Sequence, residues 1–456
     1  MKKYMQSFIK HDPFAHWFIG FFLLLASIFL AHYWVVGQAV YGDGIYHYAF
    51  TRSIVKDADI RLNNEYGHTY SPVNNNSIVP APPVVVENVT ANGSAQNKYG
   101  IGAPLFWVIP FAFVDFFVGV WNVVSLPISS HGFSDIYQIA VGLFNVMAAT
   151  LGAVLLYLFL KNYFKPQAAF LSVTALLFGS SLFYYSSLDV VNSHPFSFLF
   201  SSIFLFFWWK TFAKRTLKQW FLLGLILGIL LLIRTQDVVF LLLILAEIVV
   251  LLKQKGFNLS FIKKEIPKYV LFGAGIILAF LPQLFVWQTI YGDIWTSPYF
   301  KSGEGFTFLQ PHLIDLFINP KIGIVFWTPL FLVCIAGLVA FFKKQKMLAG
   351  LSLLLVLSEL YFISSWSGWT QGEAFGVRML ISSIPFMAIG LAYVMQLLLE
   401  RFTLKKVIIS VLVLVACNFA LILYFLLMHQ SPTNDGTVVT QDRSLEKIQK
   451  LFNLPL

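Results

Sequence analysis

The fold class and the candidate chemistry of this chain both follow from residues 17–48, WFIGFFLLLASIFLAHYWVVGQAVYGDGIYHY. Residues 17–36 are apolar and as long as the roughly 20 residues that a helix needs to cross a bilayer. Asp43 follows this segment, between two glycines and close to Tyr46 and Tyr48. A carboxylate on a tightly turning backbone at a membrane–water boundary is suited to take a proton from a bound hydroxyl. The alternative interpretation is a solvated aspartate at a turn, the commoner role of an isolated acidic residue.

The composition predicts a polytopic membrane protein. Hydrophobic residues make up 58% of the 456 residues and charged residues 11%, and apolar segments recur along the chain. Basic loops on one membrane face explain the formal net charge of +10, so we predict no nucleic-acid partner. Cys334 and Cys417 both lie in apolar segments, so we predict neither a disulfide nor a zinc site. The apolar run after Trp17 is too long for a signal-peptide core, so we expect it to be retained.

We predict an all-α fold with about eleven membrane-spanning helices. The predicted spans are residues 17–36, 136–160, 167–185, 195–209, 219–233, 237–252, 269–290, 322–342, 347–364, 377–399 and 405–427. Lysine and arginine cluster in alternate loops, at 161–165, 210–218, 253–268, 343–346 and 401–406. All clusters then share one side, which the positive-inside rule assigns to the cytoplasm together with the N-terminus. A further crossing by residues 104–124 would move every cluster outside, so we predict an interfacial or re-entrant element there.

This topology predicts one membrane-embedded module over residues 1–427. Residues 37–135 are its first external loop, which holds juxtamembrane helices as well as the element at 104–124. Within that loop, residues 46–55 have helical spacing and predict a helix along the interface. Residues 428–456 are predicted to form an external tail.

The same topology gathers ionisable side chains at the external face. They are Asp43, Asp57, Asp59, Lys98, Asp189, His194, Arg234, Asp237, Asp293, Glu304, His312, Lys321, Glu373 and Arg378. Charged residues at membrane depth are costly and usually face a cavity, so we expect the functional site on this face. Arg234 lies at the tip of an apolar hairpin, Leu-Ile-Arg-Thr-Gln-Asp at 232–237. Its alternative role, with equal weight, is an ion pair with Asp237 that caps the hairpin.

Residues 186–195, SSLDVVNSHP, place Asp189 and His194 between two predicted spans. These side chains could contribute a carboxylate and an imidazole to a site at the external face. The alternative is a polar turn, followed by a proline that starts the next helix.

Residues 366–378, WSGWTQGEAFGVR, combine Trp369, Glu373 and Arg378 with several glycines. Glycines permit close backbone approach to a sugar, and a guanidinium group binds phosphate in a bidentate manner. The tryptophans alone are equally well explained as interfacial belt residues. We expect Arg378 to contribute more than Arg234, because Asp237 lies near enough in sequence to neutralise Arg234.

These motifs occur in a fixed order on one face. They are Gly-Asp-x-x-Tyr at 42–46, Asp-Ala-Asp-Ile-Arg-Leu-Asn-Asn at 57–64, Lys-Tyr-Gly-Ile-Gly-Ala-Pro at 98–104, Leu-Asp at 188–189, Ser-His-Pro at 193–195, Arg234 and the segment 366–378. The order resembles the polytopic glycosyltransferases of the GT-C superfamily, specifically family 39-like proteins related to protein O-mannosyltransferases and aminoarabinose transferases. The resemblance implies a catalytic acid in the first external loop and a polyprenyl-phosphate sugar as donor. Many relatives have a second acid where this chain has Gly44, so Asp43 acts alone or with Asp189 or Asp59.

The implied reaction is a direct displacement at the anomeric carbon, with Asp43 as general base and Asp189 as a second candidate catalytic carboxylate. The implied substrate-binding residues are Arg378, Arg234, His194, Tyr46, Lys98, Trp369 and Glu373. The acceptor, a glycan, lipid or protein, stays open, and so does a divalent metal, although no compact ligand cluster demands one. The competing function is a transporter or flippase of lipid-linked sugars, which is disfavoured because the motifs show no internal repeat. We expect a cell-membrane location with an external active site among membrane lipids.

Overall fold

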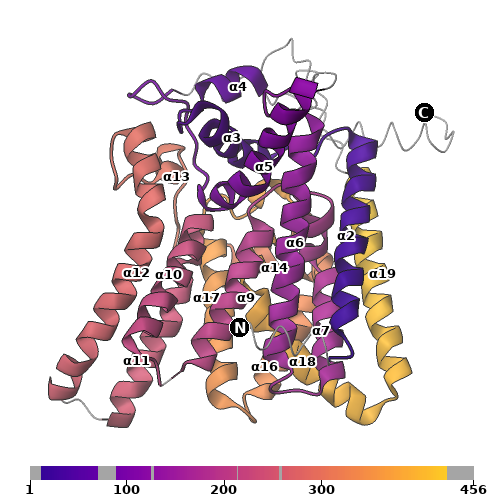
Figure 1. Ribbon diagram of the computed structural model, residues 1–456. Coiled ribbons are helices and arrows are strands. Elements are labelled where there is room, and N and C mark those ends of the chain that lie inside the picture. Colours follow the sequence, from indigo (N-terminus) through magenta and orange to yellow (C-terminus); the bar gives the residue numbers. More distant parts are fainter. Residues whose placement is uncertain (1–11, 70–88, 125–127, 213, 256–258, 429–456) are drawn as a thin grey trace.

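The structure is a computed structural model that describes residues 12–69, 89–124, 128–212, 214–255 and 259–428. Within these ranges it is helical, with two isolated β-bridges and no strand. The long helices are α2 (Ala15–Val36), α5 (Gly102–Val124), α6 (Asp135–Leu160), α7 (Pro166–Phe178), α9 (His194–Lys210), α10 (Leu217–Ile233), α11 (Leu241–Lys255), α12 (Leu259–Tyr291), α16 (Leu330–Phe341), α17 (Lys346–Ser365), α18 (Ile384–Arg401) and α19 (Leu404–Met428). Most of them run side by side as a bundle (Figure 1).

Short helices join these long ones and form much of the functional end. They are α3 (Asp43–Arg52), the π-helical turn η1 (Ser53–Asp57), α4 (Asn63–Thr69), α8 (Ser181–Ser187), η3 (Thr235–Phe240), α13 (Pro298–Lys301), α14 (Leu313–Ile318), α15 (Ile324–Trp327), η4 (Gln371–Glu373) and η5 (Arg378–Ser383). Figure 1 shows α3 and α4 together above the bundle. The helix predicted at 46–55 is therefore confirmed as α3 and its continuation η1.

Each predicted span coincides with a helix or a pair of consecutive helices to within a few residues, except that α12 begins ten residues before the predicted span 269–290. Eight helices in the described ranges are long and apolar enough to cross a membrane, or nine if α7 and α8, bent by 67°, form one span. The apolar helices α10 and α16 are shorter than that length. The all-α multi-span fold is confirmed, whereas the exact number of eleven crossings is not.

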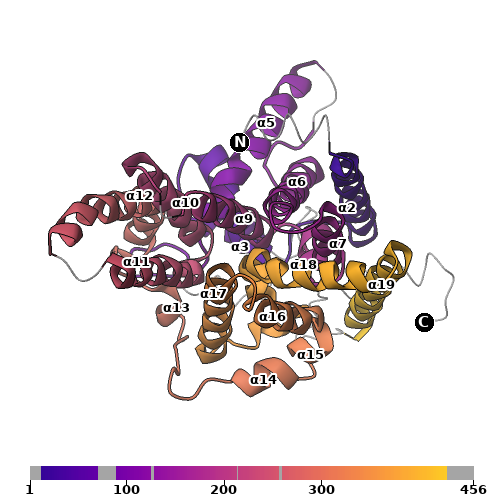
Figure 2. The same cartoon turned by 90° about the horizontal axis from the view of Figure 1, so that it is seen from below.

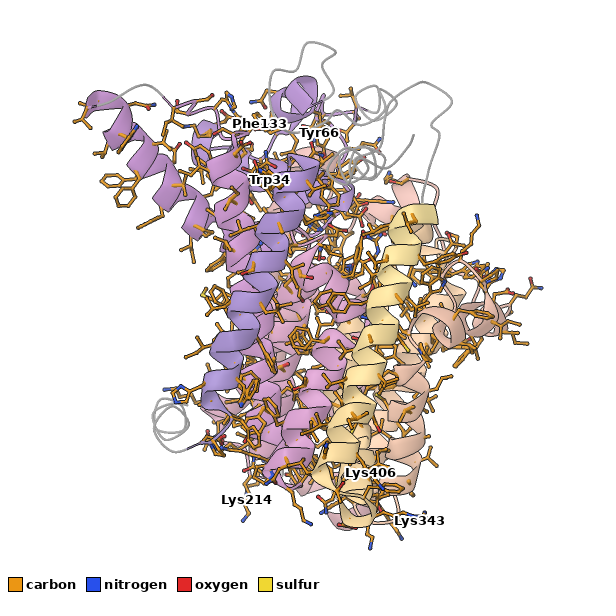
Figure 3. The ribbon with its side chains drawn as sticks, turned by 90° about the vertical axis from the view of Figure 1, so that its right-hand side faces the viewer. Trp34, Tyr66, Phe133, Lys214, Lys343 and Lys406 are labelled. Atoms are coloured by element: carbon orange, nitrogen blue, oxygen red, sulfur yellow. The ribbon has the colours of Figure 1, made fainter. Side chains whose placement is uncertain are left out.

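Labelled lysines and labelled aromatic residues lie at opposite ends of the bundle. Figure 3 shows Lys214, Lys343 and Lys406 at one end, with Trp34, Tyr66 and Phe133 at the opposite end. We refer to these as the lysine end and the aromatic end. The lysines thus share one end, as the positive-inside argument requires. The juxtamembrane helix α3 lies at the other.

The segment predicted not to cross is α5, which satisfies the length and composition of a span. It packs against α3 and α6, and it projects outward from the bundle in Figure 2. Asp115, near its midpoint, accepts from Lys56 Nζ at 2.7 Å and from the Tyr137 hydroxyl at 2.6 Å. Because Lys56 belongs to the turn that continues α3, the middle of α5 lies at the level of the juxtamembrane helix. This arrangement favours an interfacial position for α5, which stays a prediction.

Ion pairs attach α3 to its surroundings at the aromatic end. Arg52, the last residue of α3, donates to Glu65 Oε1 at 2.6 Å, pairs with Asp57, and donates from Nε to the His131 carbonyl at 3.0 Å. The Tyr48 hydroxyl donates to the Gly132 carbonyl at 2.7 Å. These contacts tie α3 to α4 and to the segment before α6, so the first residue of α3 is held on a fixed platform.

Candidate active site

Asp43 is that first residue of α3, and two glycines place it. Gly42 has φ 53° and ψ −133°, a conformation that residues with a side chain rarely adopt. A Cβ on Gly44 would lie 2.3 Å from the carbonyl oxygen of Val191, so only glycine lets α3 approach the loop before α9 this closely. An acidic side chain at position 44 would therefore have no room in this packing.

The carboxylate of Asp43 has two direct partners. Its Oδ1 accepts from the Tyr99 hydroxyl at 2.7 Å, and its Oδ2 lies 2.8 Å from Nη2 of Arg378. Burial raises the pKa of Asp43, but the charge of Arg378 and the hydrogen bond from Tyr99 outweigh this and hold it below its usual value. Asp43 is therefore ionised at neutral pH. The ion-pair partner of Arg378 is thus an acid that is distant in sequence, which local spacing does not indicate.

The glycines of the Lys-Tyr-Gly-Ile-Gly motif bring the first external loop against the end of α10. A Cβ on Gly100 would lie 2.6 Å from the carbonyl oxygen of Leu232, and one on Gly102 would lie 2.4 Å from the backbone nitrogen of Ile233. Arg234 follows directly. This close backbone approach sets Lys98 and Tyr99 beside Arg234, although the two segments are far apart in sequence.

Arg234 points into the same space but has neutral partners. Its Nη1 donates to Ser193 Oγ at 3.3 Å and lies 3.3 Å from Nδ1 of His194, and its Nη2 donates to Gln236 Oε1 at 2.9 Å. Among the residues that the structure describes, it forms no ion pair. The hairpin-capping pair with Asp237 is therefore not formed as a direct contact. Because these direct hydrogen-bond partners are neutral, the guanidinium group stays available to an anionic ligand, although Asp237 acts on it without direct contact.

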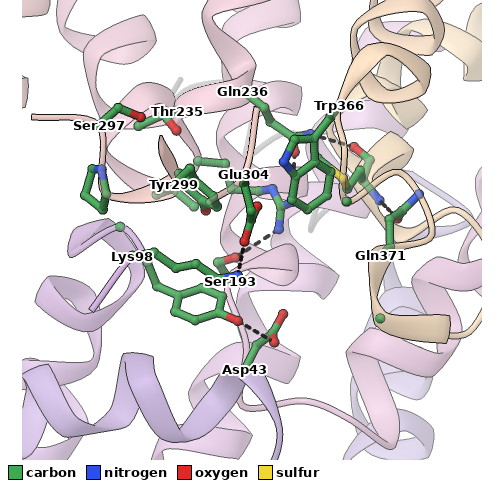
Figure 4. A pocket seen from close by; sticks show the side chains of 18 of the residues that line it. Asp43, Lys98, Ser193, Thr235, Gln236, Ser297, Tyr299, Glu304, Trp366 and Gln371 are labelled. Atoms are coloured by element: carbon green, nitrogen blue, oxygen red, sulfur yellow. Dashed lines mark hydrogen bonds and ion pairs between the residues drawn. The ribbon is translucent and has the colours of Figure 1, made fainter. Parts of the chain in front are cut away.

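Lys98 also lines this space. Its ammonium group pairs with Glu304 and lies 5.7 Å from the ring centroid of Tyr299, and both of these residues come from the long loop after α12. Figure 4 shows Lys98, Glu304 and Tyr299 around the same space as Asp43. The loop after α12 thus contributes side chains to the site, and the charge of Lys98 is balanced by Glu304, one of the acids predicted at the external face.

These side chains surround one cavity of about 450 Å³, within the usual range for a small-molecule site. Its polar lining includes Asp43, His47, Lys98, Tyr99, Asn192, Ser193, His194, Arg234, Thr235, Gln236, Gln283, Tyr299, Glu304, Gln371 and Arg378. Its aromatic lining includes Trp287, Phe300, Phe306, Phe362 and Trp366. Burial lowers the pKa of His47 to about 4, more than the nearby Asp43 raises it, so this imidazole is neutral at pH 7. The fixed positive charges of the cavity are then Arg234, Arg378 and Lys98.

Asp189 lies close to this cavity without lining it. Its backbone segment is held by Asn145 of α6, whose amide donates to the carbonyls of Val190 at 2.7 Å and Asn192 at 3.3 Å. Burial raises the pKa of Asp189 to about 7, the charge of Arg378 opposes this, and the charge of Asp43 adds to it. The two carboxyl groups therefore differ in protonation, with Asp43 ionised and Asp189 partly protonated at neutral pH.

The cavity brings together five of the nine predicted site residues, namely Asp43, Lys98, His194, Arg234 and Arg378. Tyr46 instead stacks behind Tyr99 with ring centroids 5.0 Å apart, and Trp369 stacks on His312 at 5.0 Å. The side chain of Glu373 lies outside the described part of the chain. Neither Tyr46 nor Trp369 lines the cavity.

Sequence reasoning missed several lining residues, chiefly Tyr99, Ser193, Gln236, Glu304 and Trp366. Tyr99, Ser193, Gln236 and Trp366 all lie within motifs that the sequence analysis singled out. Including the neighbours of each chosen residue in the predicted site would have found them. In the described ranges, no group of three or more His, Cys, Asp or Glu residues is arranged to hold a metal ion.

Comparison with known proteins identifies the architecture. Residues 132–287 match the family model described as dolichyl-phosphate-mannose-protein mannosyltransferase, and no curated protein sequence matches the chain. ArnT from Cupriavidus metallidurans in the apo state has a TM-score of 0.53 and 12% sequence identity, over 96% of this chain and 71% of ArnT. The chain has the ArnT fold. ArnT bound to undecaprenyl phosphate gives a TM-score of 0.50 at 12% identity, over 95% of this chain and 71% of ArnT. The predicted resemblance to GT-C proteins related to ArnT and the protein mannosyltransferases is confirmed.

Proposed function

We propose that this protein is a membrane glycosyltransferase that moves a sugar from a polyprenyl-phosphate donor to an acceptor hydroxyl. The observation that carries this proposal is the cavity in which an ionised carboxylate, Asp43, faces two guanidinium groups, Arg378 and Arg234. A general base and a cationic phosphate site within one cavity are the two requirements of this reaction. The family model over 132–287 and the complex of ArnT with undecaprenyl phosphate support the same class of donor.

In the proposed reaction, Asp43 takes the proton of the acceptor hydroxyl, and the hydroxyl oxygen forms a bond to the anomeric carbon. The bond from that carbon to the phosphate oxygen breaks, and the electron pair leaves with the lipid phosphate. Arg234 binds the phosphate in the ground state, since its partners are neutral. Lys98 is a third phosphate ligand once Glu304 releases it.

Arg378 has a second role in this proposal because it already contacts Asp43. While the pair is intact, the carboxylate is a weak base, since the guanidinium stabilises its charged form. As the phosphate acquires charge, Arg378 turns toward it, and the basicity of Asp43 rises. The pair thus couples proton removal to departure of the leaving group. This role is consistent with the expectation that Arg378 contributes more to catalysis than Arg234.

The lipid chain of the donor has an apolar path away from the cavity. A groove of about 350 Å³ between α11 and α17 is lined by Val239, Leu242, Leu354, Leu357, Ser358, Tyr361 and Phe362. Phe362 also lines the main cavity, so the two spaces adjoin at its ring. A polyprenyl chain in this groove would place its phosphate beside Arg234 and its tail toward the bilayer.

We further propose that the site is external and the N-terminus cytoplasmic. The lysine end and the aromatic end lie at opposite ends of the bundle, and α3 with Asp43 is at the aromatic end (Figure 3). The acceptor, whether glycan, lipid or protein, is not specified by these residues.

Donor binding can be tested by tryptophan fluorescence, because Trp287 and Trp366 line the cavity. Titration of the purified protein with undecaprenyl phosphate should give a saturable change whose amplitude is reduced in Trp366→Phe, where Trp287 remains as a reporter, and whose midpoint shifts to higher lipid concentration in Arg234→Ala. Trp369→Phe is the matched control, since Trp369 stacks on His312 outside the cavity. An unsaturable change, or one equal in Arg234→Ala, would contradict the proposed donor site.

A further inference from the structure

Two carboxyl groups lie buried behind the cavity, outside its lining. Asp237 of η3 is 0% exposed and Glu359, two thirds of the way along α17, is 1% exposed. Oδ1 of Asp237 and both carboxyl oxygens of Glu359 have no hydrogen-bond partner among the described residues. A buried carboxylate without partners is strongly destabilising, so these groups require a compensating charge or a proton.

Among the described residues, the groups that act on this pair include one positive charge. α17 packs against both η3 and η5, and Ser382 of η5 lies beside both carboxyl groups. From α9, Ser197 donates to Oδ2 of Asp237 at 3.2 Å. Arg234 is the charged side chain that acts on both acids, and Asp237 and Glu359 repel one another if both are ionised. One guanidinium group therefore faces two acids.

The two acids are not equivalent. Asp237 is the leading favourable electrostatic partner of Arg234, and it also accepts the hydroxyl of Ser197. In the described part of the chain, neither oxygen of Glu359 has a hydrogen-bond partner of normal geometry, although Ser382 lies close by, and the negative charge of Asp237 acts on Glu359 more strongly than the positive charge of Arg234. The ionised form is therefore better supported at Asp237, and the neutral form at Glu359.

We propose that Glu359 is a neutral carboxylic acid that holds one proton for the pair, so that Asp237 stays ionised as the counter-charge of Arg234. A carboxylic acid kept neutral by an apolar site can donate a hydrogen bond at neutral pH. Here the Glu359 proton is directed toward Asp237, through Ser382 or directly. Glu359 is then a positioning residue that acts through Arg234 and does not touch the substrate.

This arrangement has a consequence for the cavity. With Glu359 neutral, Arg234 and Asp237 sum to zero charge, and the hydrogen bonds to Ser193 and Gln236 aim the guanidinium group at the cavity. Loss of the Glu359 proton adds a negative charge behind Arg234 and lowers its attraction for a phosphate. The consequence for donor binding rests on the proposed function, but the protonation state of Glu359 does not.

Infrared spectroscopy tests the protonation state without any substrate. At neutral pH, the spectrum of the full-length protein minus that of Glu359→Gln should contain the carbonyl band of a protonated carboxylic acid, and the band should shift in D₂O. The matched control is Glu265→Gln, because Glu265 forms an ion pair with Lys268 Nζ at 2.6 Å, and its difference spectrum should lack the band. Absence of the band for Glu359 overturns the proposal. A second result would also overturn the proposal. If the wild type melts at a higher temperature in NaCl than in choline chloride, and Glu359→Gln does not, then Asp237 and Glu359 bind a sodium ion and Glu359 is not neutral.

Turnover gives a second readout that a purely structural role would not produce. Glutamine reproduces the neutral acid, so Glu359→Gln should keep kcat/KM within about threefold of the wild type, and its activity should persist at alkaline pH where the wild type declines. Glu359→Ala and Asp237→Asn should each lower kcat/KM by about tenfold or more. Equal loss in Glu359→Gln and Asp237→Asn would show that both acids are ionised and would refute the assignment. If the wild type shows no sugar transfer, the proposed function is refuted. The infrared spectrum still shows whether Glu359 is protonated.

Discussion

Asp43→Asn removes one charge from the centre of the proposed reaction while keeping the shape of the side chain. The substitution removes the negative charge that lies 2.8 Å from Nη2 of Arg378. It also replaces one acceptor oxygen with an NH₂ group, and in the orientation that keeps the Tyr99 hydrogen bond this NH₂ group faces the Arg378 donor. The hydrogen bond from the Tyr99 hydroxyl, 2.7 Å long, can persist on the remaining oxygen. The variant should therefore fold, with its main defect in chemistry.

The magnitudes separate these effects. The side chains of Asp43 and Arg378 are 30% and 18% exposed, so the pair lies between a surface ion pair and a fully buried one. Its loss should lower the free energy of unfolding by about 1–3 kcal/mol. Loss of a general base lowers turnover by about 10²–10⁴-fold, which corresponds to about 3–5 kcal/mol in the activation free energy. The expected change in the free energy of unfolding is smaller than the expected change in the activation free energy. Measuring both thermal stability and turnover on one sample therefore distinguishes a catalytic defect from misfolding.

The assay measures turnover of a polyprenyl-phosphate sugar, fluorescence binding of undecaprenyl phosphate and thermal melting in detergent, on one preparation of each variant. Asp59→Asn is the matched control, because Asp59 lies in the same external loop and accepts from Ser53 Oγ at 2.7 Å, outside the cavity. We expect wild-type turnover from Asp59→Asn and near-complete loss from Asp43→Asn, with donor binding retained in both. Wild-type turnover from Asp43→Asn would refute the assignment of the base.

Four further outcomes follow. In donor titrations, Arg234→Ala should raise the donor KM, whereas Arg378→Ala and Arg378→Lys should mainly lower kcat. An unchanged donor KM in Arg234→Ala would show that Arg234 does not bind the phosphate. Glu304→Gln should lower the donor KM a few-fold at low salt by releasing the neighbouring ammonium group, and an increase would contradict this role. Because the pKa of Asp189 is raised to about 7 in the folded protein, folding takes up a proton, and the stability contributed by this proton is lost as the pH rises toward 7. The melting temperature of Asp189→Asn should therefore fall less between about pH 5 and about pH 8 than that of the wild type. A cysteine at the exposed Ser130 should react with an impermeant thiol reagent in intact cells, and labelling only after permeabilisation would reverse the topology.

The sequence was most informative where one physical property dominates. Hydropathy located every predicted span, because burial in lipid requires long apolar helices, but it did not determine the number of crossings. The short helices α10 and α16 and the oblique helix α5 are apolar without being unambiguous spans. Their roles depend on packing, which hydropathy does not record.

Sidedness and motif order correctly grouped Asp43, Lys98, Arg234 and Arg378, since charged residues on one face tend to share a cavity. Partner choice within that group could not be predicted. The pairing of Asp43 with Arg378 joins segments from opposite ends of the chain, and local spacing instead suggested Asp237 as a partner for Arg234. Aromatic residues such as Trp369 gave no indication of which ring faces the cavity and which one packs behind it.

The central claim is that the donor is cleaved at the anomeric carbon within this cavity. The most direct measurement uses the purified protein in vesicles with undecaprenyl-phosphate hexoses and pentoses, labelled separately in the sugar and in the lipid, and follows separation of the two labels. We predict that the wild type releases undecaprenyl phosphate from at least one donor, and that Asp43→Asn, folded and able to bind lipid, does not. Movement of the intact donor across the vesicle membrane, at equal rates in both proteins and without separation of the labels, would contradict the account and identify a flippase.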